Sequence, residues 1–167
     1  MDNIYLIGMM GSGKSTIAKE LSKKLNMDFV DIDNDMETIN EMEIAEIFNN
    51  FGEKKFREME SAYFIEKSKQ KNNIFSTGGG IILKKENRDA LINNGITFLL
   101  ESNSNVLLDR IKDTKNRPLL SGSDNLKVIS DIWNKRKKHY YNSCHHRIDS
   151  TNLSAHDVVE KIITILK

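Results

Sequence analysis

The 167-residue sequence predicts a single α/β domain built on a parallel sheet. Short apolar runs of strand type alternate with segments of helical periodicity, which is the pattern of an α/β protein. A strand, a glycine-rich loop and a helix follow one another at the start of the chain. The length suits one domain, and no internal repeat or linker interrupts the alternation, so we expect one domain over residues 1–167.

Each element is expected from its own local pattern of apolar residues. The last helix shows the clearest pattern: the spacing of Ser154 and Asp157 predicts a capping box, and apolar residues then repeat on one face. The expected strands are Ile4–Ile7, Phe29–Ile32, Asn73–Ser76, Thr97–Leu100 and His145–Ile148. The expected helices are Lys14–Leu25, an acidic helical region from Asp35 to Lys69, Glu86–Asn93, Ser104–Lys112, Leu126–Tyr141 and Ala155–Leu166.

The loop after the first strand carries the most specific motif. Residues 8–15 match Gly-x4-Gly-Lys-Ser, the phosphate-binding loop of many nucleotide-binding proteins. A helix N-terminus directs N–H groups and the positive end of its dipole at one point, which favours phosphate. Lys14 would add positive charge for the β- and γ-phosphates, and the Ser15 hydroxyl could ligate Mg²⁺. The sequence therefore predicts a nucleoside triphosphate site.

Composition excludes several other classes of function. The 25 basic and 24 acidic residues leave a net charge of +1, which provides no basic footprint for nucleic acid or for a membrane surface. No apolar run approaches the roughly 18 residues of a membrane helix, and the chain does not open on a signal peptide. A single cysteine, Cys144, excludes an internal disulfide and suits a reducing compartment. We expect a cytoplasmic protein with no nucleic-acid or membrane partner.

The segment Asp31-Ile32-Asp33, which carries two carboxylates, ends the second expected strand. Ligands of open parallel sheets lie beyond the carboxyl ends of the strands, and alternation along a strand would place Asp31 and Asp33 on one side. One could hold a magnesium-bound water while the other orients an attacking hydroxyl or accepts its proton. The alternative is that the pair caps the next helix.

The third expected strand is followed by Gly78-Gly79-Gly80. Three consecutive glycines carry a large cost in backbone entropy, so their presence indicates close approach of the backbone to a ligand. Six of the nine glycines fall in this loop and in the phosphate-binding loop, at one edge of the expected sheet.

Three arginines are further candidates, although each alone is most simply a solvated charge. Arg57 lies in the long acidic helical region, and Arg136 lies in the basic run 135–138, near the aromatic residue Tyr140. Arg117 lies in the polar segment 113–125, and a loop of that length inside a compact domain is typically functional. We expect this segment to act as a lid.

Together these motifs resemble the shikimate kinase family from end to end. The matching segments, in the family's order, are Gly8–Thr16, Asp31–Asp33, Phe56-Arg57, Gly78–Gly80, Arg117–Leu120, and Arg136 with Tyr140. The phosphate loop is shared with many NTPases, whereas the combination is specific. The resemblance implies a three-layer P-loop NTPase fold, with a five-stranded parallel sheet of order 2-3-1-4-5 flanked by helices.

The resemblance also implies a reaction: ATP, with one Mg²⁺ ion, would phosphorylate the 3-hydroxyl of shikimate to give shikimate 3-phosphate and ADP. The helical region of about 34–60 would bind shikimate, with Arg57 and Arg136 on its carboxylate and Asp33 on its hydroxyls. Asp33, Lys14 and Arg117 would be catalytic. Further shikimate contacts would come from Gly79, Gly80, Phe48 and Phe56. ATP contacts would come from Gly11, Ser12, Gly13, Lys14, Ser15, Thr16, Arg110, Arg117 and Thr151–Ser154, and Mg²⁺ contacts from Ser15 and, through water, Asp31. We expect a monomer.

Other readings stay open. A kinase of another polyol acid, such as gluconate, would use a similar loop and fold, but the pairing of Asp33 with the glycine triplet and two arginines disfavours it. A nucleoside monophosphate kinase would need a second base pocket and several lid arginines. A guanine-specific switch would show Asn-Lys-x-Asp, whereas Asn134-Lys135 is followed by Arg136-Lys137.

Overall fold

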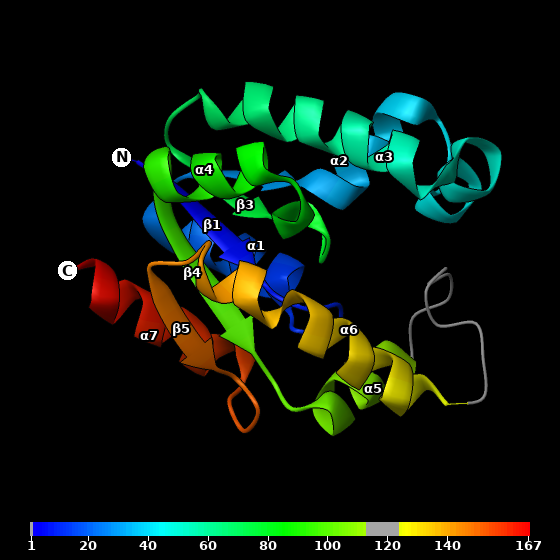
Figure 1. Ribbon diagram of the computed structural model, residues 1–167. Coiled ribbons are helices and arrows are strands. Elements are labelled where there is room, and N and C mark those ends of the chain that lie inside the picture. The colour runs from blue at the N-terminus through cyan, green and yellow to red at the C-terminus, as the bar shows by residue number, and fades with distance from the viewer. Residues whose placement is uncertain (1, 113–123) are drawn as a thin grey trace.

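The computed structural model describes residues 2–112 and 124–167 (Figure 1). All five expected strands are present within these residues and form one parallel sheet of order β2-β3-β1-β4-β5. The fold and strand order implied by the resemblance are therefore confirmed. The strands are β1 (Asn3–Ile7), β2 (Asp28–Asp31), β3 (Asn73–Ser76), β4 (Gly95–Glu101) and β5 (His146–Asp149).

Helices cover both faces of this sheet (Figure 1). No helix among the described residues has the length and apolar character needed to span a bilayer. Predicted Arg117 and all but the last two residues of the predicted lid lie outside the described residues. The helices are α1 (Lys14–Leu25), α2 (Ile32–Asn40), α3 (Ile44–Ser68), the 3₁₀ turn η1 (Ile81–Leu83), α4 (Lys85–Asn93), α5 (Ser104–Lys112), α6 (Asn125–Tyr141) and α7 (Ala155–Leu166).

The central strand β1 divides the core into two clusters. Tyr5 and Ile7 pack among residues of α2 to α6, whereas Ile4 and Leu6 pack among residues of α1 and α7. A strand that is buried on both faces has a continuous run of apolar residues, which is why the sequence predicted this strand. The result is a three-layer domain whose central strand leads directly into the phosphate-binding loop.

The start of α7 shows the predicted capping box. The Ser154 hydroxyl accepts a hydrogen bond from the Asp157 N–H at 3.1 Å, and the Asp157 carboxylate accepts one from the Ser154 N–H at 3.0 Å. These bonds satisfy two N–H groups that the helix itself cannot satisfy. The apolar face that follows buries Val158, Val159 and Ile162 against α1 and the sheet.

The long acidic region forms two helices in place of one. Glu41, with φ of 52°, ends α2 in the left-handed conformation, and α3 begins after a capping box between Glu43 and Glu46. Within α3 the backbone leaves helical geometry at Gly52, where φ is 79° and ψ is 161°. These breaks separate α2 and the first turns of α3 from the longer helix that carries Arg57.

The expectation that Asp31 and Asp33 share one side of a strand is wrong. β2 ends at Asp31, whose carboxylate caps α2 by accepting a hydrogen bond from the Asn34 N–H at 3.3 Å. The capping alternative is therefore confirmed for Asp31. Asp33 instead lies in the first turn of α2, where helical geometry, and not strand alternation, sets its direction.

Candidate active site

The phosphate-binding loop joins β1 to α1 at the carboxyl edge of the sheet. Gly13 precedes α1 with φ of 86°, a left-handed conformation that glycine adopts without steric cost. The first turn of α1 contains no acidic residue, so its positive dipole end is not neutralised locally. The Lys14 ammonium is almost buried and donates to the carbonyl oxygens of Gly8 and Met9 at 3.0 and 2.9 Å. The loop therefore surrounds a positive charge.

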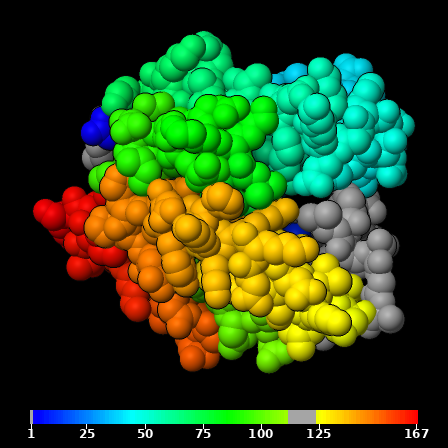
Figure 2. Space-filling view, viewed as in Figure 1, coloured from blue at the N-terminus to red at the C-terminus, as the bar shows by residue number. Residues whose placement is uncertain are grey.

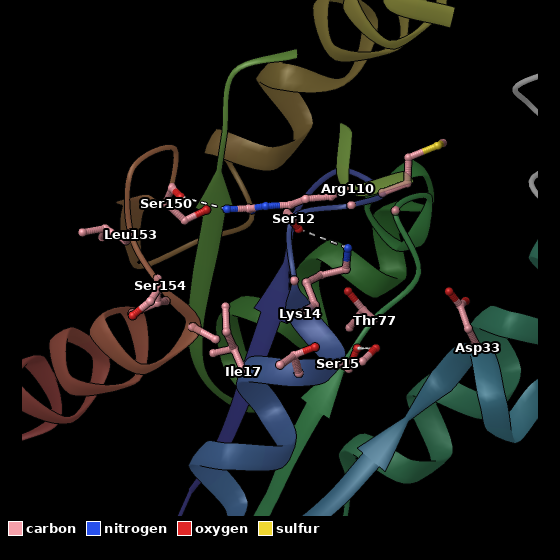
Figure 3. A pocket seen from close by; sticks show the side chains of 18 residues that line it. Ser12, Lys14, Ser15, Ile17, Asp33, Thr77, Arg110, Ser150, Leu153 and Ser154 are labelled. Atoms are coloured by element: carbon pink, nitrogen blue, oxygen red, sulfur yellow. Dashed lines mark hydrogen bonds between the residues drawn. The ribbon is translucent and has the colours of Figure 1, made fainter. Parts of the chain in front are cut away.

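A cavity of about 570 Å³ opens above this loop (Figure 3). It unites all six predicted loop residues with five predicted residues from distant segments: Asp33, Gly79, Arg110, Leu153 and Ser154. In Figure 3, Asp33 and Ser150 lie at opposite ends of the cavity, with Lys14 and Ser15 between them. The lining residues are 10–17, Asp33, Ser76, Thr77, Gly79, Arg110, Ser150, Leu153, Ser154, Ala155 and Val158.

One end of the cavity suits a flat aromatic base. The Arg110 guanidinium donates to the Ser150 carbonyl oxygen at 3.3 Å and to the Ser102 hydroxyl at 3.4 Å, so the tips of β4 and β5 hold it in place. Leu153 and Val158 provide an apolar lining at this end. Within the predicted segment Thr151–Ser154, Thr151 does not line the cavity: its hydroxyl accepts a hydrogen bond from the Asn103 N–H.

The predicted metal ligands are separated by the fold. The Ser15 hydroxyl lies in the cavity, 2.9 Å from the Ser76 hydroxyl, whereas Asp31 is not among the lining residues. The described residues contain no cluster of three or more His, Cys, Asp or Glu side chains that could form a protein cage. Hydroxyl and carboxylate oxygens beside a phosphate site nevertheless fit Mg²⁺, which usually keeps several waters and takes few protein ligands.

At the other side of the glycine triplet, Arg57 is held in a defined orientation. Its guanidinium donates to the Glu60 carboxylate at 2.8 Å, and its Cζ lies 5.8 and 5.1 Å from the ring centres of Phe48 and Phe56. Glu60 is only 1% exposed, and within residues 2–112 and 124–167 its Oε1 has no hydrogen-bond partner. Burial raises the pKa of the Glu60 carboxyl, and the ion pair with Arg57 opposes that shift.

The glycine triplet makes these approaches possible. A Cβ at Gly80 would collide with the Arg57 guanidinium, and a Cβ at Gly78 would lie 2.6 Å from Glu60 Oε1 and 2.7 Å from Asp33 Oδ1. Only residues without a side chain allow the three charged groups to converge on this loop. The predicted backbone donation from Gly79 and Gly80 to a ligand stays a prediction.

Arg136 reaches the same loop from α6, which lies beside the segment from η1 to α4 in Figure 2. The Arg136 guanidinium and the Tyr140 hydroxyl both donate to the Gly79 carbonyl oxygen, at 3.2 and 2.6 Å. Tyr140 is fully buried and stacks on Trp133 with ring centres 5.7 Å apart, and burial raises the pKa of its hydroxyl to about 12. The stacked pair of Trp133 and Tyr140 therefore places Arg136 at a packed boundary.

Two arginines thus reach the loop that borders Asp33, and two phenylalanines lie against one of these arginines. Guanidinium groups recognise carboxylates through paired hydrogen bonds, and aromatic rings pack against an apolar ring body. Glu60 and the Gly79 carbonyl were missed as functional groups by sequence reasoning. The three-residue spacing from Arg57 to Glu60 on a helix could have indicated the ion pair, because such residues are neighbours on the helix surface.

Comparisons with known proteins agree with this geometry. The family model described as shikimate kinase matches residues 10–167. A shikimate kinase of Thermodesulfovibrio yellowstonii is 40% identical over 98% of this chain and 94% of its own length, and one of Caldicellulosiruptor saccharolyticus is 41% identical over 99% and 95%. The structure of shikimate kinase from Acinetobacter baumannii in complex with shikimate superposes with a TM-score of 0.96, at 32% identity over 99% of this chain and 93% of that one. This chain belongs to the shikimate kinase family.

Proposed function

We propose that this protein transfers the γ-phosphoryl group of ATP to the 3-hydroxyl of shikimate, forming shikimate 3-phosphate and ADP. One observation carries the proposal: Asp33 lines the phosphate-loop cavity and, across Gly78, faces the Glu60 carboxylate that orients Arg57. The Asp33 carboxylate therefore lies between the phosphate site and the arginine proposed to bind the carboxylate of the acceptor. The similar structure from Acinetobacter baumannii is described as a complex with shikimate, which supports the choice of acceptor.

The residues divide the chemistry between them. The N-terminus of α1 and the Lys14 ammonium bind the phosphate chain and stabilise the charge of the phosphoryl group during transfer. Arg57 and Arg136 bind the acceptor carboxylate, and Phe48 and Phe56 pack against its ring. Asp33 then orients the attacking hydroxyl and accepts its proton. Because this hydroxyl is held next to the phosphate chain, transfer to water is disfavoured.

The magnesium ion belongs to the same proposal. The Ser15 hydroxyl would be the direct protein ligand, and Asp31, whose carboxylate caps α2, would act through a water. When bound, the ion neutralises charge on the β- and γ-phosphates. Arg117 and the lid of 113–125, closing on the phosphates, remain part of the proposal as sequence predictions, as do a monomeric state and a cytoplasmic location.

The test is an acceptor screen that measures ADP release with shikimate, gluconate, nucleoside monophosphates or no acceptor. Of these acceptors we expect only shikimate to support turnover, and we expect the Lys14→Met variant to lose that turnover. Turnover with gluconate but not with shikimate would support the runner-up kinase. ATP hydrolysis that does not depend on any acceptor would overturn the kinase assignment.

A further inference from the structure

The helix that carries Asp33, α2, has a second carboxylate, Asp35, on its opposite flank. At about 100° per residue, the buried side chains Ile32 and Met36 define the face of α2 that points into the core. On the same geometry, Asp33 lies roughly 80° to one side of that face, and Asp35 lies roughly 80° to the other. Both carboxylates are partly buried. A rotation of α2 about its axis would therefore move the Asp33 and Asp35 carboxylates together.

The flank opposite Asp33 is held by one short hydrogen bond. The Tyr63 hydroxyl on α3 donates to the Asp35 carboxylate at 2.6 Å. Hydrogen bonds to an ionised acceptor at such a distance belong to the stronger class in proteins. Burial and the Asp35 carboxylate both raise the pKa of the Tyr63 hydroxyl, so this group stays a donor throughout the neutral range. The ring of Tyr63 packs against the core cluster beneath α2 and α3.

Other hydrogen bonds among the described residues restrain α2 at its start and in its second half. Asp31 caps the first turn, and the Glu37 carboxylate accepts a hydrogen bond from the Ile44 N–H at the start of α3. The first holds the start of the helix, and the second ties its second half to α3 on the side away from Asp35. The aliphatic contacts of the buried face are not directional, so they limit the roll of the helix less sharply than a hydrogen bond does. The bond from Tyr63 to Asp35 is directional and lies off the axis, so it opposes a roll.

We propose that Tyr63 and Asp35 are positioning residues for Asp33: their hydrogen bond sets the roll of α2 and thereby the place of the Asp33 carboxylate relative to Arg57 and Glu60. This inference rests on the proposed role of Asp33 in the transfer reaction. Tyr63 lies on the same helix as Arg57 and Glu60, two turns or less along it. The bond therefore ties the helix of the base to the helix of the carboxylate-binding arginine.

Tyr63→Phe removes only the hydroxyl and keeps the packed ring. We expect kcat to fall roughly 10–100-fold, because misplacement of a reacting group by about 1 Å costs up to 10²-fold. The dissociation constant for shikimate should rise, whereas that for ATP should change less than about twofold. Asp35→Asn keeps the acceptor oxygen without its charge, and we expect a smaller loss of the same kind.

Tyr141→Phe is the matched control. The Tyr141 hydroxyl also donates to a carboxylate, that of Glu101 at the end of β4 at 3.1 Å, and its ring lies against Arg147 of β5. This variant should keep kcat and both affinities within about twofold of the parent. Melting temperatures of all variants provide the measure of folding.

A double-mutant cycle with Asp33→Asn decides between positioning and general stability. If Tyr63 acts through Asp33, Tyr63→Phe should have almost no further effect on kcat or on shikimate affinity in the Asp33→Asn protein. Equal losses in both backgrounds would overturn the inference and indicate a merely structural role, as would unchanged kcat in folded Tyr63→Phe. If Asp33→Asn alone kept its kcat, the proposed role of Asp33 would fail instead.

Discussion

The two halves of the active site are built in different ways. The phosphate half comes from one continuous segment, in which β1, the loop and the first turn of α1 follow each other along the chain. The acceptor half is assembled from α2, α3, the glycine triplet and α6, and one of its hydrogen bonds joins Gly79 to Tyr140, 61 residues apart in the sequence. The first half is determined by local geometry, whereas the second depends on correct packing of several helices.

This difference predicts different sensitivities. A change in the phosphate half should act on nucleotide chemistry and leave shikimate binding intact. A change in the acceptor half should propagate among Asp33, Arg57, Glu60 and the glycine triplet, because these groups share contacts. Variants that separate the two kinds of effect provide the sharpest test of the comparison.

Asp33→Asn should produce the largest effect. We expect kcat to fall by roughly 10²–10⁴-fold, because the hydroxyl loses its proton acceptor, while ATP affinity stays nearly unchanged. A coupled assay measures turnover, and titration measures nucleotide binding. A variant that kept most of its kcat would remove Asp33 from the chemistry.

Lys14→Met should follow, with a loss of roughly 10²–10³-fold in kcat from reduced stabilisation of the transferring phosphoryl group. Shikimate affinity without nucleotide should be preserved, since the Lys14 ammonium donates to the phosphate loop, at the carbonyl oxygens of Gly8 and Met9 and the Ser12 hydroxyl. Loss of shikimate binding in this variant would break the division into two halves.

Arg57→Lys should have a smaller effect, confined to the acceptor. We expect the KM for shikimate to rise roughly tenfold or more while the KM for ATP stays nearly constant, because an ammonium cannot replace a planar two-pronged donor. The ammonium would also leave part of the buried Glu60 carboxylate without its partner. Equal changes in both KM values would indicate a folding defect in place of a binding defect.

Alkylation of Cys144 should show whether variants in either half of the active site keep their fold. Burial raises the pKa of its thiol to about 11, so the protonated form dominates at pH 8. Alkylation of the native protein should therefore be roughly 100-fold slower than that of the urea-unfolded chain, and should accelerate about tenfold per pH unit below pH 10.

The same slow alkylation is expected in the Asp33, Lys14 and Arg57 variants. Fast alkylation in one of these variants would show that the fold near β5 is destabilised. Its change in kcat or KM would then not be specific to its own half of the site. The thiol also links stability to pH. Because its folded pKa lies above its unfolded value, its contribution is complete below the unfolded pKa and is lost as the pH rises toward about 11.

The sequence by itself determined the sheet, most element boundaries and the phosphate half of the site. Strand periodicity, capping spacing and the Gly-x4-Gly-Lys-Ser pattern are local properties, so they can be recognised along the chain. The apolar runs identified β1 and β3 closely, and the capping-box spacing identified the start of α7. The resemblance of the ordered motifs then identified the family.

Tertiary structure alone decided how the acceptor half is arranged. Whether Asp33 lies on a strand or a helix depended on which N–H group the Asp31 carboxylate accepts from, since a cap and a strand end look alike in sequence. The burial of Glu60 and the two hydrogen bonds to the Gly79 carbonyl arise from segments that meet only after folding. Side-chain pairs across distant helices leave no periodic pattern in the chain, so their roles became visible only in three dimensions.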